Sequence, residues 1–133
     1  MISKTVTYKD FNGTERKETF YFNLTEAEVT ELQLGTVGGL TDMLQKIVDA
    51  NDSATLIKVF KDLVLKAYGE KSADGRRFMK SDEIRAAFAE TEAYSQIFME
   101  LVFDNDAAAK FFNGVIPAGM ADRVKNIPAP APN

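Results

Sequence analysis

The chain has 133 residues and a mass of 14.7 kDa, which fits one domain with a substantial core and excludes a large multidomain enzyme. Hydrophobic residues make up 45% and charged residues 27%, a composition that excludes a disordered chain and a membrane-embedded one. The net charge of −4 argues against nucleic acid as the main partner, because proteins that bind phosphates carry an excess of Lys and Arg.

The chain contains no Cys and no His. Their absence removes thiol nucleophiles, disulfides, imidazole bases and the zinc sites built from these ligands. No uninterrupted apolar stretch approaches the roughly 18 residues that span a bilayer, and the N-terminus has no apolar segment of signal-peptide length. We therefore expect a cytoplasmic chain with no membrane partner.

The first 23 residues have the pattern of a β-hairpin. One face of the first strand is formed by every second residue, namely Ile2, Lys4, Val6 and Tyr8. A turn at Asn12-Gly13 leads into the second strand, in which Phe20 and Phe22 share one face. Because an isolated hairpin is only marginally stable in water, we expect this aromatic face to pack on helices.

Two helices are predicted next. The first begins at Thr25, which can form a capping box with Glu28, and ends near Gly35. Glycines at 35, 38 and 39 indicate a flexible connection. The following segment has an apolar stripe with helical spacing, which consists of Leu40, Met43, Leu44, Ile47 and Val48.

The central helix is predicted over 56–67, where the apolar stripe is widest. Its inward residues are expected to be Leu56, Val59, Phe60, Leu63, Val64 and Ala67. Ile57 and Leu65 widen this stripe beyond what one neighbouring helix would cover. The polar run over 70–77 predicts a loop.

The C-terminal half continues the helical pattern. Ser81 or Asp82 opens a helix whose inward residues are expected to be Ile84, Ala87 and Phe88. A second segment starts near Thr91 and repeats the spacing with Tyr94, Ile97, Phe98, Leu101 and Val102; the two segments are either two helices or one bent helix. Asp104 can cap a short last helix, with Gly114 as the glycine that follows its end.

Together these elements predict a mainly helical α+β fold. The N-terminal hairpin covers 2–23, and about five helices lie in the helical part over 24–114. We expect a single globular domain over 1–116. All four prolines follow, and they predict an exposed, extended tail over 117–133.

No catalytic, cofactor-binding or metal site is predicted. If Gly75 took position six of a calcium loop, Ser81 would occupy position twelve, where a bidentate Glu is needed. The glycine-rich segment over 35–39 lacks the Gly-Lys-Ser/Thr end of a phosphate-binding loop. Asp104 and Asp106 fit helix capping better than acid/base chemistry. We therefore expect no enzyme and no cofactor.

Six residues are candidates for binding a protein partner. Arg76 and Arg77 form a basic patch on an acidic chain, which fits either a solvated loop or a contact with an acidic partner surface. The C-terminal region is crowded with large apolar residues, namely Phe103, Phe111, Phe112 and Ile116. Core packing is the ordinary role for such residues, but an exposed apolar patch there would mark a protein-binding site.

Several stretches carry a family resemblance. They are KSADGRRFMKSDEIR over 71–85, Phe88, TEAY over 91–94 and FFNGVIP over 111–117, with weaker support from LIKVF over 56–60 and YFNLT over 21–25. In these stretches the chain resembles the tail assembly chaperones of long-tailed phages, the siphophages. The resemblance covers most of residues 2–118 and includes no active-site motif.

The resemblance implies a non-enzymatic chaperone of the bacterial host cytoplasm that is not part of the mature virion. Such a protein coats the tape measure protein, helps the tail tube protein assemble around it, and acts as a homo-oligomer. A helix-in-groove mode of recognition is expected. The resemblance also implies a longer frameshifted form that recruits tube protein, for which 117–133 suits a linker.

Two other functions remain open at this point. The first is a phage tail protein of another kind, namely a minor tail or connector protein that stays in the virion. A small regulatory domain that contacts DNA or a host factor is a further alternative, although the acidity of the chain argues against DNA. An enzyme would require an ordered pocket with converging carboxylates and a bound metal.

Overall fold

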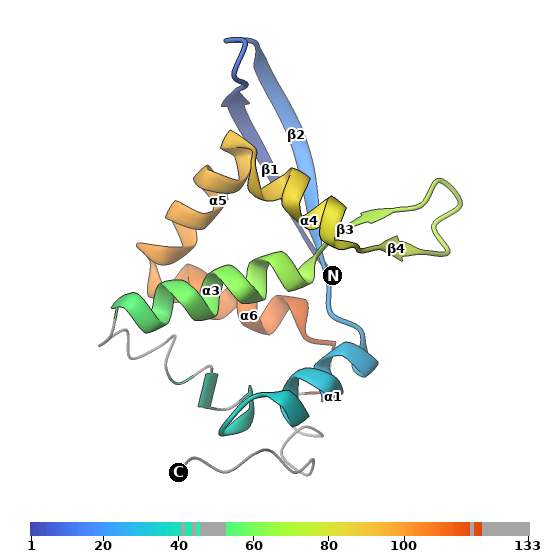
Figure 1. The fold of residues 1–133 in the computed structure, drawn as a ribbon, viewed down its shortest axis with the longest axis vertical. Coiled ribbons are helices and arrows are strands. Elements are labelled where there is room, and N and C mark those ends of the chain that lie inside the picture. The colour runs from blue at the N-terminus through green and yellow to red at the C-terminus, as the bar shows by residue number, and fades with distance from the viewer. Residues whose placement is uncertain (41, 44, 46–52, 118, 121–133) are drawn as a thin grey trace.

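The computed structural model describes residues 1–40, 42, 43, 45, 53–117, 119 and 120. The fold is mainly helical α+β, as the sequence predicts, with a four-stranded antiparallel sheet in the order β1-β2-β3-β4 (Figure 1). The elements are β1 (Ile2–Lys9), β2 (Glu15–Phe22), α1 (Glu26–Gly35), α3 (Ser53–Ala67), β3 (Tyr68–Lys71), β4 (Phe78–Met79), α4 (Asp82–Ala89), α5 (Glu92–Val102) and α6 (Asn105–Val115).

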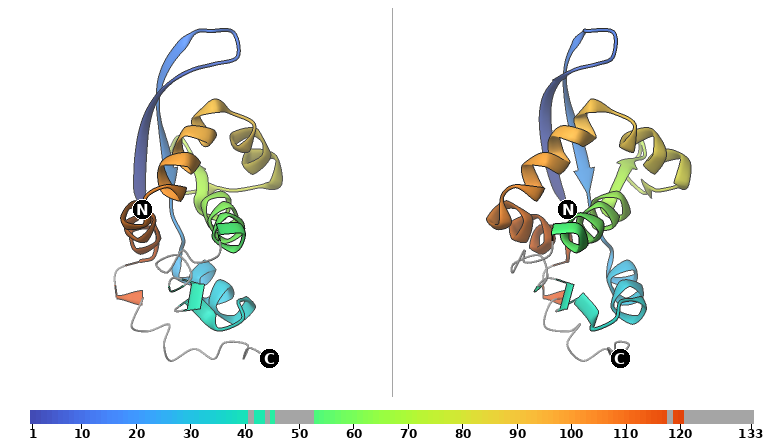
Figure 2. Two further views of the ribbon diagram at one scale, coloured as in Figure 1. Left: turned by 90° about the vertical axis from the view of Figure 1, so that its left-hand side faces the viewer. Right: turned by 60° about the vertical axis from the view of Figure 1, so that its left-hand side comes forward.

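The N-terminal hairpin forms as predicted and projects beyond the helices. β1 and β2 pair along their whole length, from Ile2 opposite Phe22 to Lys9 opposite Glu15. The carboxylate of Asp10 organises the turn, because it accepts hydrogen bonds from two backbone N–H groups of the turn at 2.9 Å. Figure 2 shows α5 running along one side of this hairpin. The expected packing of the hairpin on helices is confirmed.

The prediction of a loop over 70–77 is wrong at its first two residues, which belong to β3, and is confirmed over 72–77. Tyr68 and Gly69 pair with the end of β2, and Glu70 and Lys71 pair with β4. β3 and β4 therefore form an arm that extends the hairpin into a four-stranded sheet (Figure 1). The strands escape sequence analysis because β4 has only two residues, too few for an alternating pattern.

The core lies where the sheet meets α3, α4 and α6, and it is rich in aromatic rings. Phe22 is fully buried and contacts the rings of Tyr68, Phe88 and Phe111. Tyr68 and Phe88 stack with their ring centroids 3.9 Å apart. Phe60 of α3 completes the cluster through Phe111. The predicted inward face of β2 and the central position of α3 are confirmed.

The C-terminal helices decide one open alternative and differ from expectation at two residues. α4 and α5 are separate helices, because the Thr91 hydroxyl accepts a hydrogen bond from the Tyr94 N–H and caps a new N-terminus. Ala87, expected to point inward, is exposed. Gly114, expected after the helix end, lies inside α6. A Cβ there would lie 2.6 Å from Ile2 Cγ2, so glycine lets α6 approach β1 closely.

The folded part extends beyond residue 116. The Met120 side chain is only 2% exposed and belongs to the core, four residues past the predicted end of the domain. Most of the predicted Pro-rich tail, 121–133, lies outside the described residues. So do Leu44, Ile47 and Val48 of the second predicted helix, whereas Leu40 and Met43 are helical as predicted.

Candidate partner-binding groove

An open groove lies between α1 and α3, and its geometry starts with the junction that places α1. The Asn23 N–H donates to the Ala67 carbonyl at 2.8 Å, and the Leu24 N–H donates to the Val115 carbonyl at 3.0 Å. These bonds fix the start of α1 beside the ends of α3 and α6 (Figure 1). Thr25 and Glu28 then form the predicted capping box, so the helix starts at a defined residue.

A partly buried ion pair holds α1 against the segment that leads into α4. Lys80 Nζ donates to Glu28 Oε2 at 2.7 Å and to the Asn23 carbonyl at 2.8 Å. Burial opposes ionisation of Glu28, but hydrogen bonds from Lys80 and Thr25 outweigh it and hold the pKa of the carboxyl below its usual value.

The pKa of the Lys80 ammonium is also lowered, because burial is only partly offset by its bond to Glu28. Both shifts favour the deprotonated form, which is the charged state of Glu28 and the neutral state of Lys80. Charge is favoured on Glu28 because it accepts additional hydrogen bonds from Thr25, and disfavoured on Lys80 because Lys80 is the more buried partner.

The far end of α1 is fixed by a buried glutamine. The Gln33 side-chain oxygen accepts a hydrogen bond from the Leu40 N–H at 2.7 Å, which ties the chain after α1 back onto the helix. Gly39 makes this return possible. Its φ of +72° suits glycine, and a Cβ would lie 2.6 Å from the Gln33 amide.

Between these two fixed ends the groove has a volume of about 620 Å³. Its floor is aliphatic and is formed by Leu24, Leu32, Met43, Val59 and Leu63. Val37 stands at the rim with 53% of its surface exposed. An apolar floor that water reaches is typical of a surface that binds an apolar segment of a partner.

Charged side chains line the rim. Lys58, Asp62 and Lys66 are exposed and recur every four residues, so they form one row along the groove side of α3. Arg85 of α4 extends the row past Lys66, and its Nε donates to the Leu65 carbonyl at 3.1 Å. This wall therefore carries three cations and one anion.

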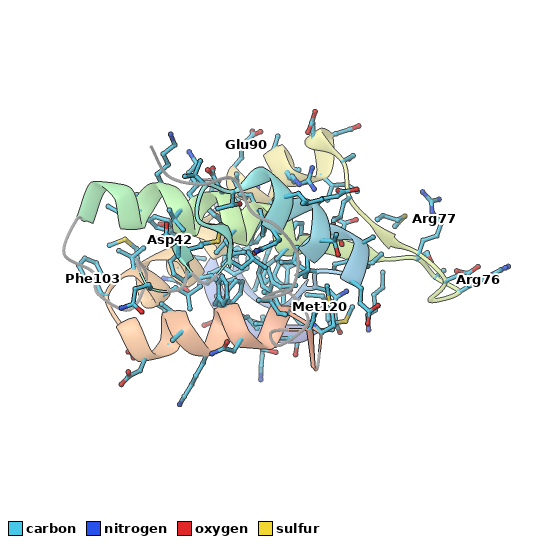
Figure 3. All side chains as sticks on the ribbon, turned by 90° about the horizontal axis from the view of Figure 1, so that it is seen from below. Asp42, Arg76, Arg77, Glu90, Phe103 and Met120 are labelled. Carbon is cyan, nitrogen blue, oxygen red and sulfur yellow. The ribbon has the colours of Figure 1, made fainter. Side chains whose placement is uncertain are left out.

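The structure places the six predicted partner-binding residues in three separate regions. Arg76 and Arg77 lie at the tip of the β3–β4 arm (Figure 3), and their backbone N–H groups donate hydrogen bonds to the side chains of Asp74 and Ser72, respectively. Phe103 lies at the opposite end of the molecule and is 78% exposed.

The other three aromatic and aliphatic candidates are not on an exposed patch. Phe111 and Phe112 are 2% and 3% exposed and belong to the core, and Ile116 is partly buried against it. The prediction that they contribute to an exposed apolar patch is therefore wrong for Phe111 and Phe112. Both lie on the inward side of α6, whereas Phe103 follows the last residue of α5 and escapes burial.

The groove itself is not among the predicted site residues. It depends on how far α1 stands from α3, which no local sequence pattern encodes. The extra width of the apolar stripe of α3 does not locate the groove, because Ile57 and Leu65 do not line it. Leu65 is partly buried, Ile57 is exposed, and Val59 of the same helix forms part of the groove floor.

Neither a metal cluster nor a membrane-spanning helix is found among the described residues. No group of three or more Asp, Glu, His or Cys side chains in this part of the chain is arranged to hold a metal ion. Among the same residues, no helix is long and apolar enough to cross a membrane.

Comparison with known proteins identifies the family. The family model described as phage tail assembly chaperone matches residues 1–132. The chain belongs to this family. Its general role is therefore that of a chaperone in phage tail assembly, with protein partners in that process, and the family is in general non-catalytic. No curated protein matches the chain significantly, and no solved structure does.

Proposed function

We propose that this tail assembly chaperone binds the tape measure protein of its siphophage through the groove between α1 and α3 and keeps it soluble. The observation that carries the proposal is an aliphatic floor open to solvent between charged walls, on a member of a family that assists tail assembly. A long helical protein with an exposed apolar face aggregates unless that face is covered.

The dimensions of the groove suit a helix. α1 has ten residues and is about 15 Å long, so it flanks roughly three turns of a helix laid beside it. Apolar side chains at positions i, i+3, i+4 and i+7 of a bound helix would meet the aliphatic floor. Each square ångström of apolar surface covered in this way contributes about 25 cal/mol before the costs of association are subtracted.

The proposal extends to assembly around the bound tape measure protein. Many copies of the chaperone act together as a homo-oligomer in the cytoplasm of the bacterial host and leave before the virion is complete. A longer frameshifted form recruits the tail tube protein, with residues 117–133 as linker. Arg76, Arg77 and Phe103 are exposed and do not line the groove, which makes them available for contacts with other subunits or with tube protein.

Co-expression with the tape measure protein tests the central part of the proposal. We expect the chaperone to keep the tape measure protein in the soluble fraction and to co-purify with it. Val37→Glu places a charge at the groove rim and should abolish both effects. Leu34→Glu is the matched control, because Leu34 is similarly exposed on α1 and does not line the groove.

Two results would contradict the proposal. If the tape measure protein precipitates with and without the chaperone, the pair does not have the proposed relationship. If mass spectrometry detects the chaperone as a stoichiometric component of purified virions, the protein is a minor tail or connector component instead.

A further inference from the structure

The charges on the α3 wall are arranged in a pattern that specifies more than an apolar ligand. Lys58, Asp62 and Lys66 alternate in sign along the groove at intervals of four residues. In the described part of the chain, none of the three forms an ion pair with another side chain. The wall therefore presents a row of uncompensated charges to whatever occupies the groove.

The opposite wall of the groove, formed by α1, offers a partner fewer charges. Glu28 is already paired with Lys80, so its charge is largely satisfied within the protein. Glu31 is exposed on the same wall and lines the groove. The charges available for a partner therefore lie mainly on the α3 side, where cations outnumber anions even though the whole chain has a net charge of −4.

We propose that the groove selects an amphipathic helix with the flank pattern acidic-x3-basic-x3-acidic, matched to Lys58, Asp62 and Lys66. This inference rests on the proposed function and adds the class of helix that the groove accepts. Residues eight apart on a helix are separated by about 12 Å along its axis, so two acidic residues with the same spacing on a partner helix lie opposite the two lysines. A basic residue between them lies opposite Asp62.

The pattern of three charges is the same in both chain directions, but Arg85 breaks this symmetry. Its guanidinium lies at the Lys66 end of the row, where the bond from Nε to the Leu65 carbonyl holds it in place and Nη1 lies 3.8 Å from Oδ1 of the exposed Asp82. A fourth acidic residue at one end of the partner pattern meets Arg85 in only one orientation of the helix. The geometry thus favours one direction of binding.

Designed peptides test this without the tape measure protein. Three fluorescent, Ala-rich peptides of about 18 residues share one Leu face and differ in the flank: Glu-x3-Lys-x3-Glu, the charge-swapped Lys-x3-Glu-x3-Lys, and a neutral Gln version. Exposed ion pairs are individually weak, so we expect the first peptide to bind the full chain about tenfold more tightly than the second, with the neutral one between. Raising the salt concentration to about 0.5 M should reduce the difference.

A charge-reversed chaperone provides the decisive comparison. The triple variant Lys58→Glu, Asp62→Lys, Lys66→Glu should reverse the order of the two charged peptides, with an unchanged circular dichroism spectrum as the check on folding. Lys61→Glu is the matched control, because Lys61 is exposed on the same helix and does not line the groove. It should leave the order unchanged.

Each outcome decides the inference. Equal binding of the three peptides, no binding of any, or an order that the triple variant leaves unchanged would overturn it. The proposed function fails separately, by loss of tape measure solubilisation in co-expression. If the groove discriminates the peptides while the tape measure protein precipitates, the helix specificity stands and the proposed partner is wrong.

Discussion

The aromatic core and the groove bury apolar residues in opposite ways. In the core, the rings of Phe22, Tyr68, Phe88 and Phe111 contact one another and leave almost no surface exposed. In the groove, aliphatic side chains form a floor that solvent reaches, and charges surround it. The comparison shows that the enclosed part of the core stabilises the fold, whereas the partly buried Leu32, Met43 and Val59 at its edge are available for a partner.

The comparison predicts that stability and partner binding can be changed separately. Core substitutions should reduce the free energy of unfolding, because they open cavities among rings that have no alternative contacts. Substitutions at the groove rim should leave that free energy nearly unchanged and reduce binding.

Phe60→Ala should have the largest effect. Phe60 is fully buried on α3, so truncation to Ala removes its contact with Phe111 and leaves a cavity. We expect a loss of about 3 to 5 kcal/mol in the free energy of unfolding, measured by urea denaturation. A change below about 1 kcal/mol would show that α3 does not pack in the core as described.

Met120→Ala should cost about 2 kcal/mol, because it also opens a buried site. An exposed tail over 117–133, as the prolines predict, would make deletion of 119–133 nearly neutral for thermal stability. The burial of Met120 changes that expectation, so deletion of 119–133 should lower the melting temperature as Met120→Ala does. Deletion of 121–133 is the matched control, because it keeps Met120. If all three variants have the melting temperature of the parent protein, the placement of Met120 in the core is wrong.

The Glu28–Lys80 ion pair should give a smaller, pH-dependent effect. Glu28→Gln keeps the capping box and removes the charge, so we expect a loss of about 1 kcal/mol at pH 7. The folded-state pKa of Glu28 lies below its ordinary value of 4.5, so its contribution is complete above that value and disappears as the pH falls through the folded pKa.

The stability difference between the parent protein and Glu28→Gln should therefore shrink as the pH is lowered from about 7 to about 3. Asp10, whose pKa is also lowered by its bond from Arg16, titrates in the same acidic range in both proteins and cancels in the difference. A difference that stays constant with pH would show that the charge of Glu28 does not stabilise the fold.

Val37→Glu should have the smallest effect on stability and a large effect on binding. The side chain is more than half exposed, so we expect the free energy of unfolding to change by less than about 0.5 kcal/mol. Pull-down of the tape measure protein should nevertheless be lost. Loss of stability comparable to that of Met120→Ala would mean that Val37 belongs to the core rather than to the rim.

Local signals predicted much of the fold and little of the site. The turn at Asn12-Gly13 and the capping box of Thr25 and Glu28 depend on neighbouring residues, so the sequence shows them directly. β3 and β4 depend on pairing with strands distant in sequence, and the groove depends on the spacing of two helices. Phe103 and Phe111 show the same limit, because Phe103 follows the end of α5 whereas Phe111 lies on the inward side of α6, and tertiary packing decides which ring is buried.

Site-specific photo-cross-linking tests the groove as the binding surface most directly. A photoreactive amino acid replaces Val37 in one protein and Leu34 in another, and each is co-expressed with the tape measure protein before irradiation. The account predicts a cross-linked product from position 37 and none from position 34, because only Val37 lines the groove. Equal products from both positions, or a product from position 34 alone, would contradict it.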